Sequence, residues 1–132
     1  AGVDSGIYTG IYTVNTGVYG FDILNPSQCK YKYKHQRLQD PTSIVINEDG
    51  NIFVCNGFPD YCIHQLTASC QLVAIFTQEI PSSPHAMFCD NGRLYVTCLW
   101  SSDIIVFKPG YQGNSYFLYF IDIKTFNDVI NK

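Results

Sequence analysis

The sequence is poor in charged residues. Asp, Glu, Lys and Arg make up 14% of its 132 residues, and the formal net charge is −3. This balance gives no overall electrostatic attraction to nucleic acid or to anionic lipid. No apolar run approaches the roughly 18 residues that span a bilayer, and the start, AGVDSGIYTG, lacks the charged and apolar regions of a signal peptide. We therefore expect a soluble protein without a membrane partner, and any affinity for nucleic acid must come from a local cluster of charge.

The sequence also lacks the motifs of known catalytic centres. It contains no HExxH, phosphate loop, nucleophile elbow or paired-carboxylate motif. It has no CxxC, and its three His are scattered, so the ligand spacing of a zinc ribbon is missing. We predict no catalytic residues and no cofactor, and favour a binding protein over an enzyme.

Six cysteines could suggest a disulfide framework in a secreted protein. Most of them lie inside apolar strand patterns such as IFVCN, AMFCD and YVTCL, where a thiol behaves as a small buried hydrophobe. We therefore expect reduced thiols and a cytoplasmic rather than a secreted protein. Cys55 and Cys62 flank one short loop and are the pair most expected to meet.

What the chain has in quantity is apolar and aromatic side chains, 46% and 15% of its residues. Tyr, Phe, Ile and Val dominate this set and favour β-strands. The length suits a single domain with a sizeable core. We expect an all-β domain over residues 1–132.

One segment is repeated. Residues 41–77 align with residues 84–120 at an offset of 42 to 43, and Gly50 falls on Gly92 in matching acidic turns. Residues 10–39 form a weaker copy, in which TVN matches VCN and FDILNPSQCKYKY matches HQLTASCQLVAIF. We divide the chain into units of about four strands at residues 1–40, 41–83 and 84–126, with a tail at 127–132.

In the middle unit the expected strands are TSIVIN, NIFVCN, CIHQLT and QLVAIFT, separated by EDG, GFPDY and AS. In the third unit we expect KPGYQGN to be a loop and DIKTFNDVINK to form at most a helical turn. A period near 40 to 45 residues with four strands is typical of a β-propeller blade.

The repeat resembles the NHL repeat of six-bladed propellers. The Asp that usually follows the second strand in that family is replaced by Asn56 and by Cys98, which puts the family's closing polar contacts in doubt. The resemblance is carried by Pro41, Ile44, Ile46, Gly50, Ile52, Phe53, Val54, Ile63 and Leu66, and again by Pro84, Met87, Gly92, Leu94, Tyr95, Val96, Ile105 and Phe107. It implies three four-stranded blades, half of a six-bladed ring.

Three blades cannot close a ring, since propellers have about four to eight. An open arc would expose apolar blade faces at both ends. Either the chain pairs head to tail with a second copy, or it is a fragment of a longer propeller. We favour the homodimer, because heterologous contacts that close generate rings.

Propeller loops segregate by edge, so the loops between second and third strands and those between units should share one rim. Binding in propellers usually uses this rim or the central channel. Trp100 in CLWSSD suits an anchor for a protein, a peptide or a sugar ring, or it caps a blade interface. The expected ligand-binding residues on this rim are Trp100, Phe58, Asn56, Asp60, Asp103, Arg37 and His85.

His85 is the single metal-ligand candidate. The segment PHA resembles the part of peptidyl-hydroxyglycine amidating lyases that supplies a zinc-binding His, and two copies of His85 could meet in a dimer's channel. The equivalent position in the second unit is Thr42, whereas those enzymes need several His. A metal-dependent lyase or hydrolase is thus an alternative hypothesis, and a structural His the simpler one.

CKYKYKHQR, residues 29–37, interleaves cations and aromatics, as in strands that bind single-stranded nucleic acid. Strand alternation would place the Lys on one face and the Tyr and His35 on the other, as on an outer strand that Lys protects from aggregation. We interpret the chain as a non-enzymatic propeller scaffold that binds a protein, peptide or glycan, with a glycan-binding lectin as a further alternative.

Overall fold

The computed structural model describes residues 7–10, 17–22, 24–77, 80, 82–112 and 115–125, and within these ranges every regular element is a strand. The strands are β1 (Ile7–Gly10), β2 (Gly17–Asp22), β3 (Asn25–Tyr33), β4 (Pro41–Ile46), β5 (Ile52–Asn56), β6 (Cys62–Leu66), β7 (Leu72–Phe76), β8 (Pro84–Asp90), β9 (Arg93–Cys98), β10 (Asp103–Gln112) and β11 (Ser115–Thr125).

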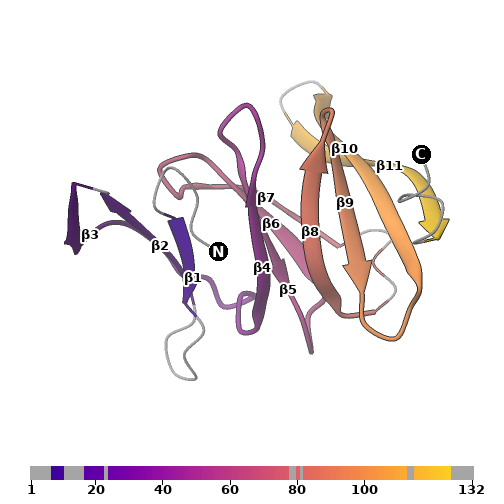
Figure 1. Ribbon diagram of the computed structural model, residues 1–132. Coiled ribbons are helices and arrows are strands. Elements are labelled where there is room, and N and C mark those ends of the chain that lie inside the picture. The colour runs from indigo at the N-terminus through magenta and orange to yellow at the C-terminus, as the bar shows by residue number, and fades with distance from the viewer. Residues whose placement is uncertain are drawn as a thin grey trace.

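The strands form three antiparallel meanders, β1-β2-β3, β4-β5-β6-β7 and β8-β9-β10-β11, in chain order. We call them the first, middle and third sheets. Figure 1 shows them side by side, with the middle sheet between the other two. The inner strand β4 of the middle sheet contacts both β1 and β8, and the outer strands β7 and β11 also meet. This is the blade-to-blade arrangement expected of a propeller.

The first sheet has three described strands, not the four expected. The segment TVN, residues 13–15, which we matched to a second strand, lies outside the described residues. The hairpin β2–β3 contains two register shifts, between Gly20 and Phe21 and between Phe21 and Asp22. These irregularities lie in the part of the sequence where the repeat is weakest.

The two acidic turns form as predicted. Gly50 and Gly92 have φ angles of 83° and 73°, which glycine adopts without the steric cost of a side chain. In the first of these turns, Asn47 Oδ1 accepts hydrogen bonds from the amides of Asp49 and Asn51, both at 3.0 Å. The short polar side chain thereby fixes the turn between β4 and β5.

The middle sheet is buried on both faces, which explains its continuous apolar pattern. All five residues of β5 and all five of β6 are buried. Because side chains alternate along a strand, Val54 packs with the first sheet while Phe53 and Cys55 pack with the third.

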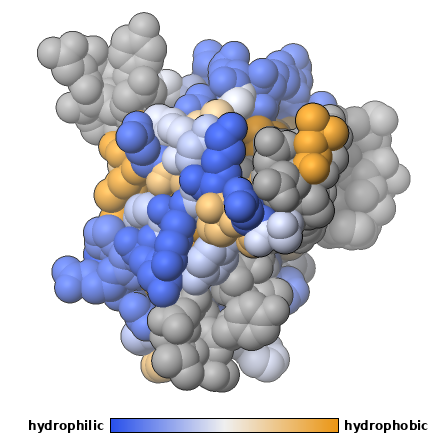
Figure 2. Space-filling view, turned by 90° about the vertical axis from the view of Figure 1, so that its left-hand side faces the viewer, coloured by the Kyte–Doolittle hydropathy of each residue, from blue (hydrophilic) through white to orange (hydrophobic). Residues whose placement is uncertain are grey.

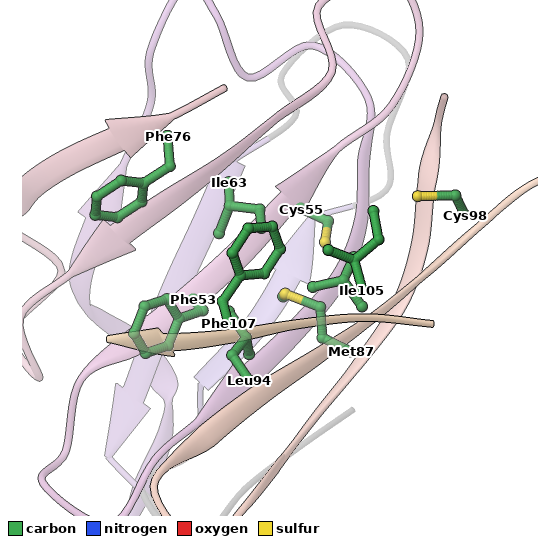
Figure 3. Packing of buried hydrophobic residues seen from close by; sticks show 10 residues of the cluster. Phe53, Cys55, Ile63, Phe76, Met87, Leu94, Cys98, Ile105 and Phe107 are labelled. Carbon is green, nitrogen blue, oxygen red and sulfur yellow. The ribbon is translucent and has the colours of Figure 1, made fainter. Parts of the chain in front are cut away.

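The contact between the middle and third sheets is almost wholly apolar. Figure 3 shows the side chains of both sheets interdigitating. The buried residues of this contact are Phe53, Cys55, Ile63, Phe76, Met87, Leu94, Val96, Cys98, Ile105 and Phe107. The contact between the first and middle sheets buries Val18, Tyr33, Leu38, Ile44, Ile52, Val54, Leu66 and Cys70.

The third sheet corrects two expectations. Most of KPGYQGN is strand, because β10 continues to Gln112 and pairs with β11 throughout. Pairing with β9 stops at Phe107, so Pro109 lies where β10 has one neighbour, and its missing N–H is tolerated. Asp122–Thr125 belong to β11 rather than to a helical turn, and residues 126–132 lie outside the described residues.

The two ends of the arc differ in character. On the far face of the third sheet, Tyr95, Ile104 and Val106 form a buried cluster, and Val106 pairs with Tyr95 across the strands. The outer side of the first sheet faces the viewer in Figure 2, and hydrophilic side chains cover much of it. Lys30 and Lys32 of β3 are exposed while Tyr33 between Lys32 and Lys34 is buried, which confirms the predicted alternation.

The six cysteines are all free thiols. Cys55 packs against the third sheet, whereas Cys62 lies near Arg37 on the side of the first sheet, so the expected pairing of these two is wrong. In the part of the chain that is described, no helix has the length and apolarity that crossing a membrane requires.

Candidate functional site

Two kinds of loop meet at one edge of the middle and third sheets. The antiparallel order brings residues 57–61 and 99–102, which follow β5 and β9, to the same edge as the connections that lead into β4 and β8. The Gly57 amide donates to the Asp40 carbonyl, and the Leu99 amide donates to the Ser83 carbonyl, both at 2.8 Å. We call residues 34–40, 57–61, 82–83 and 99–102 the rim.

Asn56 holds the rim together from beneath. Its side chain is fully buried, and Oδ1 accepts the Asp40 amide at 2.8 Å. Its Nδ2 donates to the carbonyls of Asp60 and Gly57, at 2.8 and 3.2 Å. We predicted Asn56 as a ligand-binding residue. In this structure its side-chain amide forms hydrogen bonds with the backbone of two loops.

Gly57 permits the close approach of these loops. A Cβ at this position would collide with the carboxylate of Asp40 and lie 2.9 Å from Ser83 Oγ. Only glycine fits such a contact without displacing its neighbours. The backbone of the rim is therefore tightly packed, although its tips are exposed.

Arg37 and Asp60 form the one salt bridge found among the described residues. Arg37 Nε and Nη2 donate to Asp60 Oδ2 and Oδ1 at 2.7 and 2.9 Å. The hydrogen bonds to Arg37 lower the pKa of Asp60, and those to Asp60 raise the pKa of Arg37. The pair links two rim loops, and its half-exposed position limits its contribution to stability to about 0–1 kcal/mol.

Beneath this ion pair lies a hydrogen-bonded cluster of Tyr33, His64 and Cys62. Tyr33 Oη lies 2.7 Å from His64 Nδ1, and Cys62 Sγ lies 3.4 Å from His64 Nε2. The Arg37 carbonyl lies 3.4 Å from the same Nε2. The arrangement suits a neutral imidazole that accepts from Tyr33 and donates through Nε2.

The titratable groups of the cluster are neutral. Burial lowers the pKa of His64 to about 4 and raises the pKa of Cys62 to about 11. At neutral pH both groups are therefore uncharged, whereas a reactive cysteine requires a lowered pKa and a thiolate. Burial likewise raises the pKa of Tyr33 to about 12. The cluster joins two sheets rather than activating a nucleophile.

Sequence reasoning missed this cluster. Alternation in β3 predicted that Tyr33 and His35 share a face, and alternation in β6 places Cys62 and His64 together. Nothing in the sequence indicated that these two faces meet, because Tyr33 and His64 are 31 residues apart.

The tips of the rim carry exposed aromatic side chains. Trp100 is 97% exposed and Phe58 is 72% exposed, on the equivalent loops of two neighbouring sheets. Leu99, beside Trp100, is 38% exposed. Trp100 has a φ angle of 64°, a left-handed conformation that is uncommon for a bulky residue. Three of the six exposed large hydrophobic residues described in the chain thus lie on two short loops.

Asp103 and His85, the other two residues expected on the rim, lie at its border. Both are exposed, at the beginning of β10 and near the beginning of β8. Close to His85, Thr42 Oγ1 donates to the Pro84 carbonyl at 2.8 Å and joins β4 to β8. Among the residues that the structure describes, no group of three potential metal ligands comes together.

The arrangement of the sheets is similar to that of a solved protein, Hsv2 of Kluyvelomyces marxianus, which is a β-propeller. The similarity covers 83% of this chain with a TM-score of 0.66 at 9% sequence identity, and the chain spans 42% of the length of Hsv2. No protein-family model and no curated protein sequence matches the chain. At this identity the likeness shows the fold alone, and the chain has a β-propeller fold.

Proposed function

We propose that the chain is a non-enzymatic binding scaffold of NHL-like propeller type, which pairs with a second copy into a six-bladed ring and binds a protein or peptide on its rim. The observation that carries the binding proposal is the exposure of Phe58 and Trp100 on loops whose bases are fixed by backbone hydrogen bonds. Aromatic residues that project from a rigid base are typical anchors of protein interfaces.

The chemistry of the buried groups supports binding rather than catalysis. His64 and Cys62 are the buried side chains most like a catalytic pair, and both are neutral at physiological pH. His64 contacts the Arg37 carbonyl, and the Arg37 side chain binds Asp60 on the loop that presents Phe58. In this proposal the cluster is a support for the rim.

The dimer proposal rests on the number of sheets. Three sheets are fewer than the roughly four to eight blades that a closed ring requires. On the far face of the third sheet, Phe88 stacks on Tyr95 with ring centroids 4.6 Å apart, and Phe88 is 40% exposed. A second copy that packs against this face would cover Phe88.

The rim can be tested by comparing three forms of the purified, immobilised chain. The double variant Phe58→Ser/Trp100→Ser removes both aromatic tips, and Leu24→Ser removes a leucine that is 92% exposed in the turn before β3. We expect a defined partner to be retained by the unmodified chain and by Leu24→Ser, and lost by the double variant. Equal retention by all three would contradict the rim proposal.

A lectin would give a different result in the same comparison. If neutral oligosaccharides bind and their binding depends on Trp100, the rim is a glycan site and the protein partner is wrong. We favour a protein or peptide because the rim adds a salt bridge and exposed carboxylates to its aromatic tips.

A further inference from the structure

Trp100 is held in an unusually defined position for an exposed residue. The preceding residue, Leu99, donates its amide to the Ser83 carbonyl at 2.8 Å and accepts the Ser82 hydroxyl at 2.9 Å. Just beyond it, Ser101 Oγ accepts the Asp103 amide at 3.1 Å. The backbone is thus fixed on both sides of the indole. Binding of a ligand would therefore cost little conformational entropy in this loop.

The cost of this conformation supports a functional role. A left-handed φ is disfavoured for a large side chain, and such outliers concentrate at ligand-binding and active sites. The indole itself is 97% exposed, so burial of the ring does not offset the energetic cost of this conformation in the free protein. The hydrogen bonds to Ser82 and Ser83 secure the loop instead.

Two exposed carboxylates lie on or beside the loops that surround Trp100. Asp103 is exposed three residues on, and Asp40 is exposed beside Gly57 on the neighbouring loop. Within the described part of the chain, neither carboxylate forms a salt bridge, and Arg37 pairs with Asp60.

We propose that Trp100 and Asp103 together recognise a cationic side chain, Arg or Lys, in a partner peptide. This inference rests on the proposed function of the rim and specifies the partner's chemistry. A guanidinium or ammonium group over the indole face gains a cation–π interaction, and an Arg can in addition donate to the Asp103 carboxylate while it stacks. The guanidinium of Arg37 is paired with Asp60, so it does not compete for the Asp103 carboxylate.

The intrinsic fluorescence of the chain provides a direct test, because Trp100 is its only Trp. The probe is N-acetylated tetra-arginine amide, titrated at about 20 mM salt, where screening is weak. We expect a saturable change in Trp100 emission, and weaker binding at about 0.3 M salt. N-acetylated tetra-glutamate amide should cause no saturable change.

The matched variants are Asp103→Asn and Asp90→Asn. Asp90 is also exposed, but it ends β8 at the opposite edge. Asp103→Asn should weaken tetra-arginine binding about fivefold or more, and Asp90→Asn should leave it unchanged. Because the Asp103 contact to Ser101 uses the backbone amide, the substitution keeps the loop in place.

The outcomes separate this inference from the proposed function. No saturable response to tetra-arginine, or equal binding by the two Asp→Asn variants, overturns the cationic partner. If a neutral oligosaccharide such as maltotetraose binds in its place, the inference fails while the rim remains a binding surface. If in addition Phe58→Ser/Trp100→Ser retains its partner like the unmodified chain, the rim proposal fails too.

Discussion

The two faces of the middle sheet are buried in different ways. Toward the third sheet it presents Phe53, Cys55 and Ile63 to an apolar cluster. Toward the first sheet its apolar residues give way, near the rim, to Cys62 and His64, which are hydrogen-bonded to groups of the first sheet and its connection. One face provides packing energy, and the other combines packing with polar contacts of fixed geometry.

The polar groups on the two faces also differ in how well they are satisfied. Asn56 and His64 have partners for their side-chain polar atoms on the first-sheet side. Gln65 is on the third-sheet side, because it pairs with Phe53 across the strands, and its Oε1 is buried without a hydrogen-bond partner among the residues that the structure describes. We infer from this difference that hydrogen bonds fix the geometry of the rim. The interface between the middle and third sheets would instead tolerate a wholly apolar surface.

Truncating a residue of the apolar interface should have the largest effect. Leu94 is fully buried on β9 and packs against the middle sheet, so Leu94→Ala should lower the free energy of unfolding by about 2–5 kcal/mol. The matched control is Leu24→Ala, whose side chain is 92% exposed and should change stability by less than about 0.5 kcal/mol. Urea unfolding measures both; similar losses would contradict the assignment of this interface as the main core.

The polar interface should weaken in acid. Burial holds the pKa of His64 at about 4, below its ordinary value of 6.5, so between these values the unfolded state binds more protons than the folded state. The contribution of neutral His64 to stability should therefore be fully present above pH 6.5. The free energy of unfolding should fall by about 3 kcal/mol as the pH drops to about 4.

His64→Gln is the control for this pH dependence. It removes the titrating group, so its stability should fall less over the same interval than that of the unmodified chain. Identical slopes between pH 6.5 and 4 would mean that His64 is not buried in its neutral form.

Asn56→Ala should destabilise the chain by about 1–3 kcal/mol, because it leaves the Asp40 amide and the Asp60 carbonyl without their partner. Asn56→Asp keeps an acceptor for Asp40 but loses the donor to Asp60, so it should not restore stability. Thermal unfolding of the three forms measures this effect. Full stability of Asn56→Asp would contradict the assigned orientation of the amide.

The smallest expected effect has the opposite sign. Gln65→Met removes a buried acceptor that has no partner and keeps a similar volume, so we expect a gain of up to about 1 kcal/mol in the free energy of unfolding. Urea unfolding beside Asn56→Ala gives the contrast between the two faces. A loss as large as that of Asn56→Ala would show that Gln65 is hydrogen-bonded.

Local patterns were sufficient to predict the middle sheet. NIFVCN is a continuous apolar run between turn residues, and β5 covers all of it except Asn51. The alternation in CKYKYKHQR likewise predicted which side of β3 is exposed. In both cases the two-residue period of a strand and the flanking turn residues are enough to predict the strand and its exposed side.

Contacts between sheets could not be predicted in this way. The partners of His64 come from residues about 30 positions earlier in the chain, and only the packing of the first sheet brings them close. The exposure of Trp100 was one of two interpretations. Its left-handed φ and the hydrogen bonds of Leu99 to Ser82 and Ser83 are indicated by no local pattern. The strand nature of Lys108–Gln112 depends on pairing with β11, which extends beyond the pairing with β9.

The central claim is that the three sheets form half of a propeller, which a second copy completes. Its most direct test is the solution mass of the purified chain, measured by light scattering across a dilution series. We predict a stable species of twice the 14.9 kDa chain mass, reduced to a single chain mass by Phe88→Asp. A well-folded species of 14.9 kDa at every concentration would contradict the two-copy ring.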